Sequence, residues 1–168
     1  MNNIGSNNQD NNDVETKFKS IFLFNAVHDV LKTVAGISME EMKVESFRDI
    51  HFTEACVSGV YFMNGPKNAI LIVTIPTAAA YTLVSTFTKI PVSELKADNI
   101  CDAINELTNM ISGKIKHQLA PLGIQYLNSH CFSIYGQEYY ILHKGKLKNI
   151  AKKYKADTTE LVLRILFV

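Results

Sequence analysis

The sequence predicts an α+β domain in which two long antiparallel helices pack on one side of a mostly antiparallel sheet. Apolar residues recur at helical spacing over two long segments, residues 19–36 and 98–119. Short runs rich in β-branched and aromatic residues, bounded by turn-forming residues, lie between and after these segments. The resulting order of helix, strands, short helix, long helix and strands indicates two similar halves.

Length and composition predict one domain with an ordinary hydrophobic core. The chain has 168 residues, of which 47% are apolar, and this is enough to form a single core. Residues 1–15 are rich in Asn and nearly free of large apolar groups, so we expect a disordered tail there and one domain over 16–168. The three cysteines are scattered, which argues against a disulfide framework and favours a cytoplasmic protein.

Charge and motif spacing argue against several classes of function. The net charge of +1 gives no footprint for nucleic acid or an anionic membrane. The lysines between 144 and 155 are interpreted as a solvated strand face that discourages edge pairing. The uncharged segment 69–88 is as long as a membrane helix, but Pro76 and several threonines interrupt it. No two histidines have zinc-protease spacing, so we expect no metal bound by this chain.

The individual elements follow from periodicity, turn residues and helix ends. Thr77 is expected to cap a short helix, and Asp157-Thr158 to form the last turn. The expected helical segments are Lys19–Gly36, Thr77–Thr88, a turn near Val92–Leu95, and Asp98–Leu119. The expected strands are Cys56–Met63, Ala69–Ile75 after a turn at Asn64-Gly65, Leu127–Tyr135, Tyr139–His143, Leu147–Tyr154 and Glu160–Phe167.

The two main helices show a short internal similarity. The segment Asp29–Gly36 overlays Glu106–Gly113, so that acid falls on acid and a small residue followed by glycine falls on the same pair. Two interpretations of the glycines stay open. They permit a close approach between helices, or Gly36 simply ends its helix.

The long helix has one apolar and one polar side. Its apolar stripe consists of Ile104, Leu107, Ile111 and Ile115, and its polar side carries Asp102, Asn105, Glu106, Asn109 and Lys116. Glu106 and Asn109 are three residues apart, so both side chains can contact one partner. Spacing alone is equally typical of an ordinary solvated helix face.

The sequence around this pair resembles the signature helix of the CheC/CheX/FliY phosphatases. In that helix an acidic residue is followed by Glu, then by two further residues and Asn, and then by a hydrophobic pair and a small residue followed by Gly. Asp102, Glu106, Asn109 and Gly113 match this pattern here. The resemblance extends over about residue 22 to the C-terminus. Members with two active halves repeat the Glu/Asn pair on the first helix, where this chain has Asp29 and Lys32. This is the CheX-like pattern of one site per chain. The family often has a proline on the next strand, where this sequence has Phe132.

The resemblance implies a chemotaxis phosphatase that hydrolyses the aspartyl phosphate of a CheY-type response regulator. Asn109 would orient the attacking water, and Glu106 would pair with the regulator's lysine. Asp102, Asn105, Ser112 and Lys116 are expected to contact the partner. Mg²⁺ would come from the regulator, with no cofactor bound by this chain.

The family also implies a homodimer joined at sheet edges. The candidate edges are the Lys-rich strand and the C-terminal hairpin. The alternative function is a non-catalytic adaptor of the flagellar switch or chemotaxis system, which would use the same helix as a docking face. No nucleic-acid or membrane partner is expected.

Overall fold

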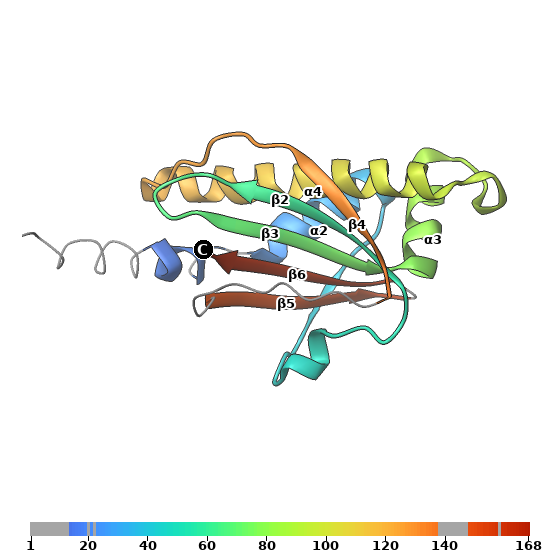
Figure 1. The fold of residues 1–168 in the computed structure, drawn as a ribbon, viewed down its shortest axis with the longest axis horizontal. Helices are drawn as coiled ribbons and strands as arrows, with labels where there is room; N and C mark the ends of the chain where they lie inside the picture. Colours follow the sequence, from blue (N-terminus) through green and yellow to red (C-terminus); the bar gives the residue numbers. More distant parts are fainter. Residues whose placement is uncertain (1–13, 20, 22, 138–147, 158) are drawn as a thin grey trace, which may run out of the picture.

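The computed structural model describes residues 14–19, 21, 23–137, 148–157 and 159–168. Residues 14–19 are helical, and the labelled elements follow them in the order shown in Figure 1. These elements are α2 (Leu23–Ala35), β1 (Glu40–Met42), η1 (Phe47–Ile50), β2 (Cys56–Met63), β3 (Ala69–Pro76), α3 (Thr77–Thr88), η2 (Val92–Glu94), α4 (Ala97–Leu119), η3 (Ala120–Leu122), β4 (Cys131–Gly136), β5 (Lys148–Ala156) and β6 (Thr159–Phe167).

The described strands form one six-stranded sheet with the order β1-β5-β6-β3-β2-β4. Every pair of neighbouring strands in it is antiparallel. Figure 1 shows the sheet in front of α2 and α4, and α4 packs against β2, β3 and β4. The predicted α+β fold is confirmed, with α4 as its one long helix of 23 residues and α2 shorter, at 13.

The sheet order is symmetric when the two halves of the chain are exchanged. Replacing β1, β2 and β3 by β4, β5 and β6, and the reverse, gives the same order read backwards. The pseudo-two-fold axis therefore passes between β3 and β6, which pair in an antiparallel register from Ala69↔Phe167 to Thr74↔Val162. The first strand of each half crosses over to pair with the second strand of the other half. The prediction of two similar halves is confirmed at the level of topology.

The main core lies between the helices and the sheet. Alternate residues of a strand face opposite sides, so Leu71, Val73 and Ile75 of β3 face the helices and are fully buried. Ile72 belongs instead to a smaller apolar cluster on the other face of the sheet. Burial of each large aliphatic side chain contributes about 1.5–3 kcal/mol.

Gly59 of β2 sets how closely α4 approaches the sheet. A Cβ atom added to Gly59 would lie 2.0 Å from Thr108 Oγ1 and 3.0 Å from the carbonyl oxygen of Ile104. Real Cβ atoms do not approach other atoms so closely, so only glycine permits this packing distance. The contact fixes the middle of α4 against β2, and no pattern in the sequence indicates it.

The beginning of the chain differs from the prediction. Val14 and Glu15, which we placed in the disordered tail, are helical and buried, so the tail prediction is wrong for these two residues. Residues 1–13 lie outside the described residues. The first long helix starts at Leu23 rather than near Lys19, because the helical segment 14–19 is separate from it.

Most other element bounds agree closely with the predictions, and Cys56–Met63 and Thr77–Thr88 are confirmed. The capping role of Thr77 is wrong, since Pro76 precedes the first turn and no side chain caps it. The strand expected from Leu127 begins only at Cys131, and the short strand β1 was missed. The strand expected over Tyr139–His143, and Thr158 of the last turn, lie outside the described residues.

The candidate dimer edges need correction. β5, the Lys-rich strand, pairs with β6 on one side and, over Lys153–Lys155, with β1 on the other. β6 lies between β5 and β3. The edges of the sheet formed by the described strands are therefore β1 and β4. In the described part of the chain, no helix is long and apolar enough to span a membrane.

Candidate functional site

One stripe of α4 faces away from the sheet. It consists of Asp102, Glu106, Asn109 and Gly113, which recur at intervals of four, three and four residues and so lie on one side of the helix. Asp102, Glu106 and Gly113 are exposed, and Asn109 is half-buried. The four residues that match the signature helix thus form one continuous, largely exposed surface, the α4 stripe.

The opposite side of α4 holds the stripe in place. Ile104, Leu107, Ile111 and Ile115, the predicted apolar stripe, are at most 2% exposed and belong to the main core. A helix buried along this length against a sheet is a rigid support for side chains on its free side. The backbone positions of Glu106 and Asn109 are therefore fixed by packing.

The side chains of Glu106 and Asn109 make no polar contacts with other described residues of the chain. Across the residues described by the structure, neither side chain forms a hydrogen bond or an ion pair. A carboxylate and an amide left free on a rigid surface can both bind a partner, since the carboxylate accepts and the amide donates and accepts hydrogen bonds.

The residues expected to flank the pair lie in different surroundings. Asn105 Oδ1 accepts a hydrogen bond from Ser133 Oγ at 2.8 Å, which ties the half-buried Asn105 to β4. Ser112 is only 1% exposed, and its hydroxyl donates to the carbonyl of Asn109 at 2.8 Å. The expectation that Ser112 contacts a partner is therefore wrong, because it lies on the core side of the helix.

Lys116 is held by a small polar network rather than extended toward a partner. Its Nζ donates to Tyr61 Oη at 3.0 Å and to Asn128 Oδ1 at 2.6 Å. The Ser129 amide also donates to Tyr61 Oη, at 2.9 Å. Burial raises the pKa of Tyr61, but the hydrogen bonds and the charge of Lys116 outweigh it and lower the pKa overall. The network joins α4, β2 and the segment before β4, and spacing along the helix gave no sign of it.

The equivalent positions on α2 carry different chemistry. Asp29 and Lys32 are both exposed, as Glu106 is on α4. A lysine has donors only and brings a positive charge, so it cannot replace the neutral amide of Asn109. Only α4 therefore presents the Glu/Asn pair.

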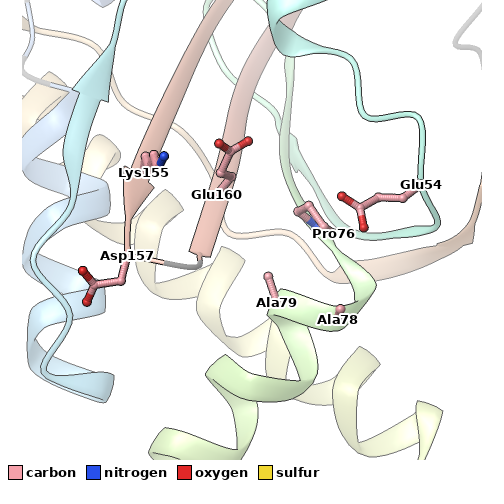
Figure 2. Close-up of a pocket in the computed structure, with 7 residues that line it drawn as sticks. All are labelled: Glu54, Pro76, Ala78, Ala79, Lys155, Asp157 and Glu160. Carbon is pink, nitrogen blue, oxygen red and sulfur yellow. The ribbon is translucent and has the colours of Figure 1, made fainter.

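Described residues line one hollow beside these helices and another at the start of α3. A groove of about 420 Å³ is lined by Asn25 and Asp29 of α2 and by Lys114 and His117 of α4, and so begins beside the α4 stripe. The other pocket, at the start of α3, has a volume of about 240 Å³, and Figure 2 shows the residues that line it.

The pocket at the start of α3 is unsuited to a phosphoryl group. No residue of α4 lines it, and its charged lining is three carboxylates, Glu54, Asp157 and Glu160, with one lysine, Lys155. This excess of negative charge repels a phosphoryl group. Within the described ranges, no three His, Cys, Asp or Glu side chains are grouped so that they could hold a metal ion.

The strand after α4 is regular despite the missing proline. Phe132, which stands where the family often has proline, lies in β4 and pairs with Val60 of β2 in an uninterrupted antiparallel register. The departure therefore leaves the ladder next to the site intact.

Solved structures with the same architecture identify the fold of this protein. A CheC-like superfamily protein from Shewanella sp. PV-4 has a TM-score of 0.74 at 22% identity, covering 93% of this chain and 97% of that one. A chemotaxis protein CheX from Desulfovibrio desulfuricans has a TM-score of 0.71 at 23% identity, covering 92% and 99%. The CheX-CheY-BeF3-Mg²⁺ complex from Borrelia burgdorferi has a TM-score of 0.69 at 17% identity, covering 86% and 94%. The chain thus has the CheC-like fold.

A family model adds a match in sequence. The model described as chemotaxis phosphatase CheX matches residues 57–134, a segment that contains β2 from its second residue on, β3, α3 and the whole of α4. A comparison with curated protein sequences finds no significant match. The family match and the shared fold together confirm the resemblance to the CheX chemotaxis phosphatase family that was stated from the sequence.

Proposed function

We propose that this protein hydrolyses the aspartyl phosphate of a CheY-type response regulator, with Glu106 and Asn109 as the acting residues. The observation that carries the proposal is the pair of exposed Glu106 and half-buried Asn109 on the rigid α4 stripe, with both side chains free of hydrogen bonds and ion pairs among the described residues. The match to the family model of the chemotaxis phosphatase CheX supports the reaction class. The complex of the Borrelia relative with CheY supports the class of partner.

The chemistry requires little from this chain. An aspartyl phosphate is an activated acyl phosphate, and the regulator holds Mg²⁺ and a lysine around it. The main remaining task is to position the attacking water in line with the bond that breaks. An amide suits this task, because its oxygen accepts a hydrogen bond from the water and it adds no negative charge beside the phosphoryl group. Asn109 takes this role.

Glu106 supplies docking rather than proton transfer. Its carboxylate lies one helical turn from Asn109 and pairs with the regulator's active-site lysine, which fixes the position of Asn109 over the phosphoryl group. Asp102 extends the same negative surface by a further turn. Neither Glu106 nor Asn109 has to change protonation state during the reaction.

The regulator supplies the metal in this proposal. The α4 stripe offers the carboxylates of Asp102 and Glu106 and one amide, and Mg²⁺ is bound more commonly through carboxylates together with phosphate groups of the substrate. The Mg²⁺ in the Borrelia complex occurs together with CheY and BeF3. One site per chain follows from Lys32 on α2.

A homodimer joined at sheet edges remains part of the proposal, with the edge revised. β4 has six residues and pairs only with β2 among the described strands, whereas β1 has three residues. A long unpaired edge is the better surface for adding a strand, so β4 is the proposed edge. Light scattering during gel filtration measures the mass, and a monomer at micromolar concentration would contradict this part.

Phosphate release tests the proposed reaction directly. Each CheY-type regulator of the source organism is phosphorylated with a small-molecule phosphodonor, and release of phosphate is followed with and without this protein. We expect faster release with the wild type and loss of at least about 100-fold in rate with Asn109→Ala. Binding of the phosphorylated regulator without faster release would favour the adaptor function instead.

A further inference from the structure

Gly113 occupies an unusual place in the molecule. It lies in the interior of α4, four residues after Asn109 and six before the last residue of the helix. It is exposed, its φ is not positive, and an added Cβ would meet nothing within 4 Å. Neither backbone conformation nor internal packing therefore requires glycine here.

Gly36 and Gly59 each have an internal reason that Gly113 lacks. Gly36 has a φ of +70°, which side chains rarely adopt, and Gly59 faces Thr108 with no room for a Cβ. A glycine inside a helix is less favourable than alanine, because it loses more backbone entropy on folding. Nothing within the described residues offsets that loss at Gly113, and a missing side chain on an exposed helix surface leaves room for a partner to approach.

We propose that Gly113 is the point at which the phosphorylated regulator comes closest to α4. The inference rests on the proposed function and adds a residue that determines docking. Gly113 lies about one turn from Asn109 on the same stripe, about 6 Å along the axis at a rise of about 1.5 Å per residue. A partner that brings a phosphoryl group to Asn109 must therefore extend over Gly113, where the missing side chain lets it contact the helix backbone.

A side chain at this position would hold the partner away from the helix. The displacement matters, because misplacing a reacting group by about 1 Å can reduce a rate about 100-fold. Gly113 therefore acts as a positioning residue. It touches the partner's surface and not the reacting atoms, and it sets the distance at which Asn109 meets the water.

The test compares substitutions of increasing size. Gly113→Ala and Gly113→Leu are measured beside the wild type and Gly136→Ala, which adds the same methyl group to open space on β4. The readouts are kcat/KM for phosphate release, binding of the regulator loaded with beryllium fluoride and Mg²⁺, and the thermal unfolding midpoint. Binding requires no turnover, so it reports on docking alone.

We expect Gly113→Ala to lower kcat/KM by about tenfold and to weaken binding, while raising the unfolding midpoint. Gly113→Leu should lower kcat/KM further, and Gly136→Ala should change neither kcat/KM nor binding. A purely structural role for Gly113 cannot give lower activity together with higher stability.

The outcomes separate this inference from the proposed function. Unchanged binding and kcat/KM in both Gly113 variants would overturn the role of Gly113, even if Asn109→Ala is inactive. A wild type that binds the loaded regulator without releasing phosphate would overturn the proposed function, while the binding series would still decide the role of Gly113. A wild type that does not bind would overturn both.

Discussion

Helices α2 and α4 occupy equivalent places in the two halves of the molecule, yet only α4 presents the Glu/Asn pair. Their aligned segments, Asp29–Gly36 and Glu106–Gly113, end on a glycine that acts differently in each. Gly36 adopts φ +70° and ends α2, and its amide donates to the carbonyl of Lys32 at 3.1 Å, as in an αL cap. Gly113 leaves α4 unbroken.

The continuation of α4 explains the difference. After Gly113 the apolar stripe goes on, and Ile115 and Leu119 are fully buried, so tertiary packing maintains the helix through the glycine. The two aligned glycines therefore have different roles: Gly36 caps the end of α2, and Gly113 is an exposed position inside α4. Of the two interpretations that the sequence left open, the cap is confirmed for Gly36, and a close approach between helices is wrong for both glycines.

The largest expected difference between the halves concerns the aligned acids. Glu106→Ala should reduce the affinity for the loaded regulator by about 30-fold or more, since removal of one partner of an interfacial charge pair costs about 2–5 kcal/mol. Asp29→Ala, the matched change on α2, should have little effect. Titration calorimetry with both variants makes the comparison, and equal losses would mean that both helices dock the regulator.

The next effect concerns how α4 is held on the sheet. Gly59→Ala should destabilise the protein by about 3 kcal/mol, because its Cβ would overlap Thr108 on α4. Denaturant unfolding measures the change, and Gly136→Ala on β4 is the control, since its Cβ meets nothing within 4 Å. Equal stabilities of the two variants would show that α4 can shift away from β2 at little cost.

Local patterns predicted the fold well, and distant contacts account for what they missed. β2 was predicted to the residue, because turn residues bound its β-branched run on both sides. β1 has three residues and forms only against β5, more than a hundred residues later. The anchoring of Lys116 depends on Tyr61, 55 residues away, so helical spacing placed Lys116 on the polar side without showing its partner.

The candidate site was predicted by resemblance rather than by periodicity. Spacing places Glu106 and Asn109 on one side of a helix, but it does not distinguish a functional site from an ordinary solvated helix face. The structure adds that both side chains are free within the described residues. It also removes Ser112 from the surface, because the helix turns that position toward the core. The roles of Gly36 and Gly113 depend on the backbone angle φ and on the space around each residue. A sequence pattern contains neither.

The aligned glycines give a smaller and opposite pair of effects on stability. Gly36→Ala should destabilise the protein by about 1 kcal/mol, since alanine is strained at positive φ, and Gly113→Ala should stabilise it by up to about 1 kcal/mol. Denaturant midpoints of the two variants, measured side by side, check the signs. A gain in stability from Gly36→Ala would contradict the cap, and a loss from Gly113→Ala would contradict the open space at that position.

The smallest effect concerns a feature before α2, where the helical segment 14–19 packs on the core. Burial raises the pKa of Glu15, but hydrogen bonds and charge from Lys67 and Lys148 outweigh this effect and lower the pKa overall. Lys148 Nζ lies 3.1 Å from Glu15 Oε2. A lowered pKa means that Glu15 stabilises the fold at pH values above its ordinary pKa of 4.5, and that this contribution disappears as the pH falls through the lower value in the folded state.

Glu15→Gln should therefore lower the unfolding midpoint slightly at pH 7 and make no difference near pH 2. Thermal unfolding of the wild type and the variant between these pH values gives the comparison, with the exposed Glu94→Gln on η2 as the control. A deficit in Glu15→Gln that persists unchanged at pH 2 would show that the side chain acts through packing rather than through its charge.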